Sequence, residues 1–276
     1  MKKTSAIALI GIIFMGLFSF LRKGGKVETT PISAILGMVL LEEPNSMEIK
    51  NVIAELRNKW ELYVDDTESD NETSVLVIND YKIAIGNMPM PIPGDEIKDN
   101  AEYNYFWKNG VEEAPKHKGH IILSLMNGGK NPVQENILYS KVASSILNNS
   151  KSIGIYIGGR SLVLKKEFYN SNVEIMTEND LPLYNWIYFG LRTRNEKQSV
   201  YTYGLSDFGK SEMEIIDSEH SLEELNSIMF DLAHYVIANN VILKHGETIG
   251  VSAEQKLKIT ESKGVYLDGK TLKIEY

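Results

Sequence analysis

Apolar residues recur at helical spacing in one long stretch near the C-terminal end of the chain. From Leu222 to Ile237 they stand three or four positions apart, which is the spacing of the buried face of an amphipathic helix. Ser218 or Ser221 can cap this helix, and Glu224 lies three residues after Ser221, where a carboxylate reaches back to free backbone N–H groups. The pattern predicts a capped helix over this stretch.

A β-hairpin is predicted immediately before this helix. Residues 200–205 are rich in aromatic and β-branched side chains, residues 206–209 are turn-forming types, and an apolar run resumes at Met213. Glu212 and Glu214 flank Met213, and alternate positions of a strand share a face. We therefore expect both carboxylates on the solvated face of the second strand.

Strand and helix patterns alternate along the rest of the chain. A continuous apolar run at residues 34–41 is typical of a buried strand, and Asn79-Asp80 between two short apolar runs indicates a tight hairpin. The predicted strands are residues 34–41, 74–78, 81–86, 121–126, 152–157, 186–192, 200–205, 213–216, 264–267 and 271–274. The predicted helices are residues 46–60, capped by Ser46, 131–148 and 221–237.

This order of elements predicts an α+β fold with mixed or antiparallel sheets and helices packed on one face. We divide the chain into an apolar N-terminal segment with a linker (1–30), an N-terminal α+β half (31–180) and a C-terminal α+β half (181–276). Both halves run strands, helix and strands. Two similar halves are therefore one interpretation, although no residue-level repeat is visible.

The N-terminal segment allows three interpretations. Residues 6–20 form an apolar run of about fifteen residues, near the lower limit for a membrane span. An uncleaved membrane anchor fits, because Arg22 and Lys23 stand where a signal peptide has small neutral residues. In the second interpretation, the natural protein starts at Met15, and the residues before it result from a misplaced start. The third interpretation is a cleaved signal peptide. We expect a cytoplasmic domain, either free or anchored to the inner membrane through residues 6–21.

The net charge of −8 narrows the range of partners. Proteins that neutralise nucleic-acid phosphates carry clustered positive charge, so the acidic balance argues against a nucleic-acid partner. The chain has no cysteine, which excludes disulfides, thiolate zinc sites and cysteine nucleophiles. Its hydrophobic content of 43% is enough for a folded core.

Three alternating prolines mark the strongest break in the pattern. Prolines at these positions hold their neighbours extended, so residues 87–94 are predicted to form a rigid, polyproline-like crossing. Such a crossing could wall a cleft or serve as a stiff surface connection. Residues 100–107 are dense in aromatic side chains and belong either to the core or to a binding face. The candidate binding residues are Pro89, Pro91, Pro93, Trp107 and Trp186.

Two pairs of polar residues are candidates for catalysis. His117 and His120 could bind a metal together with a carboxylate, but they lead into a strand, where their odd spacing points them to opposite faces. Glu212 and Glu214 could perform acid/base chemistry or bind a cation. A structural role competes with both interpretations, and we expect no resident metal and no cofactor. Residues 158–160 lack the spacing of a nucleotide-binding loop, so a turn is expected there.

Three motifs together resemble a known family. They are Asn87-Met-Pro-Met-Pro-Ile-Pro93, His117-Lys-Gly-His120-Ile-Ile-Leu-Ser124, and Tyr203-Gly-Leu with Phe208-Gly-Lys-Ser-Glu212-Met-Glu214 and Gly246-Glu-Thr-Ile-Gly250 downstream. In this order they are similar to the bacterial family called domain of unknown function 4261. The resemblance runs from Ile35 to the C-terminus and implies an intracellular bacterial α+β protein with no established activity. Gly119 departs from the alanine that such proteins generally have, and they usually lack an apolar N-terminal extension.

These observations lead to one expected function and one alternative. We expect a non-enzymatic protein-binding module whose partner is another protein, and the resemblance implies immunity-type inhibition or an accessory role in a toxin system. An acidic face could then meet a basic partner. The alternative is a metal-dependent hydrolase that uses His117, His120, Glu212 and Glu214. That alternative requires the histidine pair and the glutamate pair to lie close together.

Overall fold

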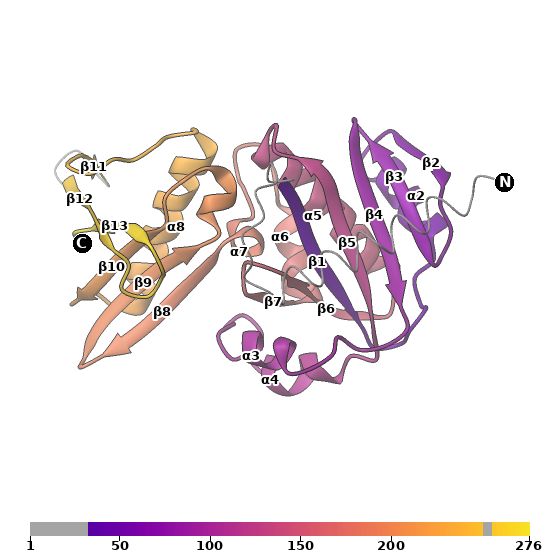
Figure 1. The fold of residues 1–276 in the computed structure, drawn as a ribbon, viewed down its shortest axis with the longest axis horizontal. Helices are drawn as coiled ribbons and strands as arrows, with labels where there is room; N and C mark the ends of the chain where they lie inside the picture. Colours follow the sequence, from indigo (N-terminus) through magenta and orange to yellow (C-terminus); the bar gives the residue numbers. More distant parts are fainter. Residues whose placement is uncertain (1–32, 251–255) are drawn as a thin grey trace.

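The chain folds into two β-sheets that stand side by side (Figure 1). The computed structural model describes residues 33–250 and 256–276, so the apolar stretch at residues 6–21 lies outside the described residues. Sheet A takes its strands from residues 33–165, and sheet B from residues 188–274. The predicted α+β fold is confirmed. Within the described ranges, no helix has the length and apolar character needed to span a membrane.

Sheet A has seven strands in the order β2-β3-β4-β5-β1-β6-β7, and every neighbouring pair is antiparallel. The strands are β1 (Ser33–Leu41), β2 (Val64–Glu68), β3 (Thr73–Ile78), β4 (Tyr81–Met88), β5 (Gly119–Gly128), β6 (Ser152–Ile157) and β7 (Leu162–Lys165). Asn79 and Asp80 both have positive φ angles, 48° and 69°, as the two central residues of a tight hairpin turn require. The hairpin predicted at this pair is therefore confirmed.

Strand β1 lies at the centre of sheet A and is buried on both faces. Val39 and Leu41 belong to the larger core, whereas Met38 and Leu40 belong to a smaller core on the opposite face. A strand buried on both faces needs a continuous apolar run rather than an alternating one. This requirement explains the run at residues 34–41.

Helices cover the two faces of sheet A unequally. The larger core receives α2 (Ile49–Asn58), α5 (Pro132–Asn148) and α6 (Lys166–Glu174), whereas the smaller core receives α3 (Glu96–Ala101), α4 (Gly110–Glu113) and the short 3-10 helix η1 (Ala114–Lys116). Most of the helical mass thus lies on one face, as expected, and α3 and α4 add a second layer below the sheet (Figure 1). Helix α5 is buried almost all round, which makes it the central helix of the molecule.

Sheet B has six strands in the order β11-β12-β13-β10-β9-β8. Its strands are β8 (Tyr188–Arg194), β9 (Lys197–Tyr203), β10 (Met213–Ser218), β11 (Thr248–Gly250), β12 (Lys256–Lys263) and β13 (Lys270–Ile274). Strands β10 and β13 are parallel and the other pairs antiparallel. The apolar stripe of α8 (Leu222–Ala238) covers one face, and the short helices α7 (Leu183–Trp186) and η2 (Leu205–Phe208) lie at its border with sheet A.

The two halves share part of their topology. In each half, consecutive antiparallel strands lead into a helix of 17 residues and a hairpin follows: β2-β3-β4-β5 lead into α5, and β8-β9-β10 lead into α8. The hairpins are β6-β7 and β12-β13. The two topologies differ in two ways. In sheet A, β1 lies between β5 and β6, and sheet B has no such inserted strand. In addition, the first strand of the β6-β7 hairpin is the inner one, whereas in the β12-β13 hairpin the second strand is the inner one.

Arg160 and Trp186 connect the two halves. The Arg160 side chain is buried, its Nε donates to Asp207 Oδ2 at 2.8 Å, and its Nη1 donates to Asn136 Oδ1 at 2.8 Å. The indole Nε1 of Trp186 donates to Ser140 Oγ at 2.8 Å. Since Asn136 and Ser140 lie on α5, both connections tie sheet B to the central helix. The predicted turn at residues 158–160 is confirmed, and its arginine has a structural partner in each half.

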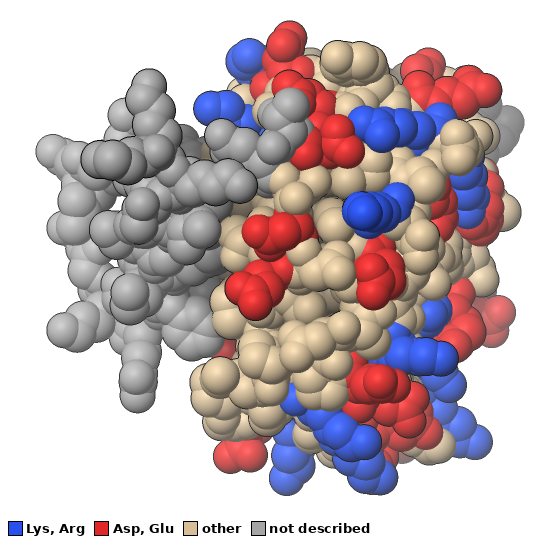
Figure 2. Space-filling view, turned by 90° about the vertical axis from the view of Figure 1, so that its right-hand side faces the viewer, with Lys and Arg blue, Asp and Glu red and all other residues tan. Residues whose placement is uncertain are grey.

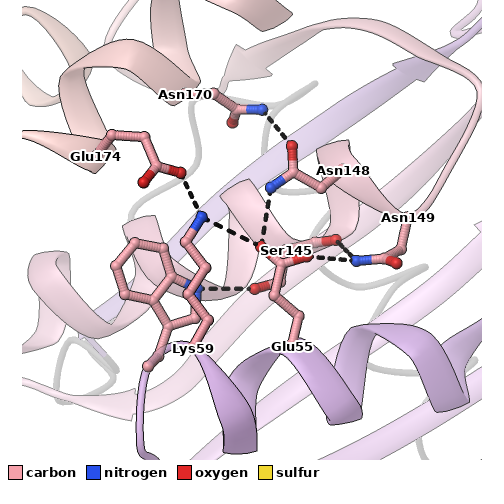
Figure 3. Close-up of polar contacts among 8 residues, drawn as sticks. Glu55, Lys59, Ser145, Asn148, Asn149, Asn170 and Glu174 are labelled. Atoms are coloured by element: carbon pink, nitrogen blue, oxygen red, sulfur yellow. Dashed lines mark hydrogen bonds and ion pairs between the residues drawn. The ribbon is translucent and has the colours of Figure 1, made fainter.

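A polar network holds the ends of α2, α5 and α6 together (Figure 3). Glu55 accepts hydrogen bonds from the side-chain amides of Asn148 at 2.8 Å and Asn149 at 2.6 Å, and Lys59 forms an ion pair with Glu174. These charged and amide groups pair with one another across three helices. The network therefore fixes the helices relative to one another on the outer side of the larger core.

Two predicted boundaries are wrong. The helix expected to be capped by Ser46 begins at Ile49, and Ser46 Oγ instead accepts a hydrogen bond from the backbone N–H of Lys151 at 3.0 Å. Trp186 lies in α7, and the strand predicted to start there begins at Tyr188.

Candidate functional site

His117 and His120 both hold the proline crossing in place. His117 Nε2 accepts a hydrogen bond from the backbone N–H of Ile92 at 2.8 Å, and its Nδ1–H donates to the carbonyl of Ala114 at 2.8 Å. The Nδ1–H of His120 donates to the carbonyl of Met90 at 2.8 Å. Both imidazoles are buried, and burial lowers the pKa of each. Both rings are therefore neutral at pH 7.

The expectation that the two histidines point to opposite faces is wrong. Strand β5 begins at Gly119, so His117 lies before the strand and strand alternation does not govern its direction. The crossing that they hold buries Ile92 and exposes its three prolines. Residues 89–94 therefore form a surface connection anchored at Ile92, with Pro89, Pro91 and Pro93 facing solvent, whereas the first two residues of the predicted crossing are the end of β4.

Glu212 holds the turn that leads into β10. Its carboxylate accepts hydrogen bonds from Thr202 Oγ1 at 2.8 Å and from the backbone N–H groups of Gly204 and Ser206 at 2.9 and 3.1 Å. Burial raises the pKa of Glu212, and the hydrogen bonds that it accepts offset this effect only in part. The turn that it fixes contains η2, whose Asp207 binds Arg160 at the junction of the two halves.

Glu214 holds a second loop and is fully buried. It accepts hydrogen bonds from the backbone N–H groups of Val265 at 3.0 Å and Tyr266 at 2.9 Å and from Thr271 Oγ1 at 2.9 Å, and it lies 2.9 Å from Lys273 Nζ. Burial by itself would raise the pKa of Glu214. The bond from Lys273 and those from the backbone outweigh burial, so the pKa is lowered.

The predictions of a solvated Glu214 and of a strand at residues 264–267 are both wrong, for the same reason. Residues 264–267 form a loop between β12 and β13 that folds over the face of β10 opposite α8. This loop covers Glu214 and supplies two of its backbone donors. A glutamate alternating with apolar residues was therefore buried by a segment about fifty residues away, which local periodicity cannot reveal.

The histidine pair and the glutamate pair are not brought together. His117 lies just before β5 of sheet A and His120 lies in it, whereas Glu212 directly precedes β10 of sheet B and Glu214 lies in it. No hydrogen bond of one pair involves the other. In the part of the chain that the structure describes, no group of three or more His, Asp or Glu side chains is arranged to hold a metal ion.

The two tryptophans predicted as binding residues are both buried. Trp107 packs in the smaller core, and its Nε1 donates to Glu113 Oε2 at 2.7 Å. Trp186 packs in the core of sheet B with its ring stacked on Phe208. Their indoles therefore stabilise the fold.

Aromatic rings and an arginine from both halves meet on the face of sheet B opposite α8. The Arg192 guanidinium lies 5.4 Å from the ring centres of both Tyr103 and Tyr201, and its Nη2 donates to Tyr201 Oη at 2.9 Å. Tyr266 stacks on Tyr201 with 5.3 Å between ring centres. Tyr103 is 52% exposed and Val265 is 49% exposed. We call Tyr103, Arg192, Tyr201, Val265 and Tyr266 the tyrosine–arginine surface.

Three features position the tyrosine–arginine surface. Tyr188 Oη donates to the carbonyl of Tyr103 at 3.1 Å, which fixes the segment from the first half against edge strand β8. Glu214 fixes the loop that carries Tyr266. Gly190 pairs with Tyr201, and a Cβ on Gly190 would lie 2.1 Å from the Tyr201 ring. The glycine therefore makes room for the ring to lie across β8.

The protonation states of Tyr201 and Arg192 follow from their burial and from the tyrosines around them. Burial first, and then the neighbouring Tyr188, raise the pKa of Tyr201 to about 12, so its phenol is neutral at pH 7. Burial would lower the pKa of Arg192, but the tyrosines around it raise that pKa. The surface thus presents a fixed positive charge framed by neutral rings. Sequence periodicity did not identify Arg192 as a site residue. The one available signal was Gly190, two positions earlier, because a glycine inside a strand often marks the close approach of another group.

Elsewhere the surface charge is mixed. Figure 2 shows the side of the molecule that carries β2 and β3, where Asp and Glu side chains stand among Lys and Arg side chains. That side is not a uniform acidic patch, although the chain has a net charge of −8. Charge alone therefore does not mark it as an interface.

Residues 201–275 match the family model described as Domain of unknown function (DUF4261). The match includes Glu212, Glu214 and the loops that they hold, whereas the proline crossing and the histidine pair lie outside it. No curated protein and no solved structure matches the chain.

Proposed function

Since its residues 201–275 make the chain a member of the DUF4261 family, whose description assigns no activity, we propose from its own surface that it is a non-enzymatic protein-binding module. The observation that carries this proposal is the tyrosine–arginine surface. Tyrosine and arginine are enriched among the residues that dominate binding energy at protein interfaces. Here they are held in place before any partner arrives, which lowers the entropy cost of association.

The partner that this surface fits is a folded protein that covers the exposed Tyr103 ring and Val265. Arg192 would donate the remaining N–H groups of its guanidinium to an acceptor oxygen of that partner. The four residues of the hydrolase alternative give less support to catalysis. His117, His120, Glu212 and Glu214 each direct hydrogen-bonding atoms at the protein's own backbone.

The test is a comparison of surface variants in partner capture. Proteins captured from the lysate of the source cells by the wild-type chain are identified, purified and titrated against Tyr103→Ala and Arg192→Ala. We expect each substitution to weaken the binary complex by about 2 kcal/mol, or about thirtyfold in Kd, because both residues lie in the ordered centre of the surface. Tyr63→Ala is the matched control, since Tyr63 is 80% exposed and lies before β2.

Equal binding by all four proteins would place the interface elsewhere and overturn the proposal. Failure of the wild-type chain to retain any protein would overturn it as well. Thermal melting of each variant shows whether lost binding reflects lost folding, and Arg192→Lys separates the charge of the guanidinium from its planar stacking.

A further inference from the structure

An open cleft of about 570 Å³ lies on the other half of the molecule, beside Trp107. Its walls come from the end of β1, from η1, from β6 and β7, and from the start of α6. Ile153 and the largely buried Trp107 are the apolar residues of its lining. The volume falls in the range of small-molecule sites, and no residue of the tyrosine–arginine surface lines the cleft.

The cleft carries charges of both signs that do not pair with one another. Lys116, Lys118 and Lys165 line it together with Glu42 and Glu167. None of these five side chains forms an ion pair within 4.0 Å with another residue that the structure describes. Opposite charges that share a cleft but stay apart leave a gap that a ligand with complementary charges can bridge.

Glu113, the third carboxylate of the lining, differs from the other two. The hydrogen bond from the Trp107 indole lowers the pKa of Glu113, and Lys165 and Lys116 lower it further. This carboxylate is thus occupied by the protein itself.

We propose that this cleft binds a short zwitterionic peptide. Its carboxylate would face the lysines, its ammonium group would face Glu42 or Glu167, and its apolar side chain would pack on Ile153 and Trp107. The mixed charge favours such a ligand over a compact polyanion, which the carboxylates would repel. The proposal is independent of the protein-binding function, because the two sites share no residue.

The experiment uses the full chain and three probes: the dipeptide Ala-Phe, its N-acetylated form and its C-terminal amide. Calorimetric titration at low ionic strength gives Kd for each. We expect Ala-Phe to bind most tightly and each blocked form to bind about fivefold more weakly, since blocking removes one exposed ion pair. Equal Kd values for the three probes, or no binding of any of them in the millimolar range, would overturn the proposal.

Substitutions then assign the charges. Replacing all three lysines, Lys116→Ala with Lys118→Ala and Lys165→Ala, should abolish the difference between Ala-Phe and its amide while preserving the difference from the acetylated form. Glu42→Gln with Glu167→Gln should do the reverse. All five residues are exposed, so the variants should fold, and Lys50→Ala on the exposed side of α2 is the control. If either set affected both differences equally, the charge-bridging arrangement would be wrong.

Discussion

The four polar residues that looked catalytic in the sequence each hold a stretch of backbone. His117 and His120 hold the proline crossing, Glu212 holds the turn at η2, and Glu214 holds the loop over β10. A buried N–H group left without an acceptor costs about 1–3 kcal/mol, so side chains that satisfy several such groups carry a large share of local stability. These two pairs of polar residues therefore mark loops whose backbone groups are hydrogen-bonded by side chains.

Glu214→Gln should lower the free energy of unfolding by about 2–4 kcal/mol at pH 7. The substitution removes the charge that is paired with Lys273 and shared with two backbone N–H groups in a fully buried position. Urea denaturation measures the effect. Glu275→Gln is the control, because its ion pair with Lys258 is exposed, and it should change stability by less than about 1 kcal/mol. Similar losses of unfolding free energy in the two variants would contradict a stabilising role for the buried Glu214 carboxylate.

The contributions of Glu212 and Glu214 to folding stability should change with pH in opposite directions. The pKa of Glu214 is lowered by folding, so its stabilisation is present above the unfolded value of about 4.3 and is lost as the pH falls through the folded pKa. The pKa of Glu212 is raised, so ionising it costs stability as the pH rises. In denaturation series from pH 3 to 7, wild-type stability relative to Glu214→Gln should rise with pH, and relative to Glu212→Gln it should fall. Parallel curves would refute the assignment.

At the scale of elements, the sequence correctly predicted features that depend on neighbouring residues, such as the cap of a helix. Helix α8 has the predicted capping box, in which Ser221 Oγ accepts from the N–H of Glu224 and the Glu224 carboxylate accepts from the N–H of Ser221. The elements that sequence missed depend on distant partners. The loop at residues 264–267 is shaped by Glu214, and Ser46 is engaged by Lys151. Local periodicity carries no information about such contacts.

Ser221→Ala should destabilise the protein by about 1 kcal/mol, because the first turn of α8 loses its side-chain acceptor. Thermal denaturation followed by circular dichroism measures the change. Ser227→Ala is the internal control: Ser227 is exposed in the middle of the same helix, where alanine is the better helix former, so stability should rise slightly. A loss of stability in both variants would indicate that the hydroxyls act through some contact other than the cap.

At the scale of the molecule, the candidate site is a product of the junction between the halves. Tyr103 comes from the loop after α3, Arg192 from β8 and Tyr266 from the loop after β12. Sequence could identify the aromatic density of residues 100–107. It could not show that Tyr103 faces solvent beside an arginine while Trp107 is buried, since the arrangement of the two halves decides which ring lies inside.

The junction itself should show energetic coupling between Arg160 and Asp207. In a double-mutant cycle with alanine at each position, we expect a coupling energy of about 1–2 kcal/mol, because the guanidinium is almost fully buried and the bond joins the two halves. The comparison cycle uses Arg194 and Asp217, whose side chains are 62% and 43% exposed, and should give less than about 0.5 kcal/mol. Equal coupling in the two cycles would show that the junction arginine adds nothing specific.

The central position of β1 has a consequence for how the chain folds. Leu41 pairs with Gly119 and Gly37 pairs with Ile157, so the middle of sheet A forms only when segments far apart in the sequence have met. Sheet B is built from neighbouring segments, apart from its β10-β13 pair. Because distant pairings slow folding, strands β1, β5 and β6 of sheet A should acquire hydrogen-exchange protection after the β8-β9-β10 meander does. During that interval the apolar edges of β5 and β6 stand open, which makes late closure around β1 the step most exposed to misfolding.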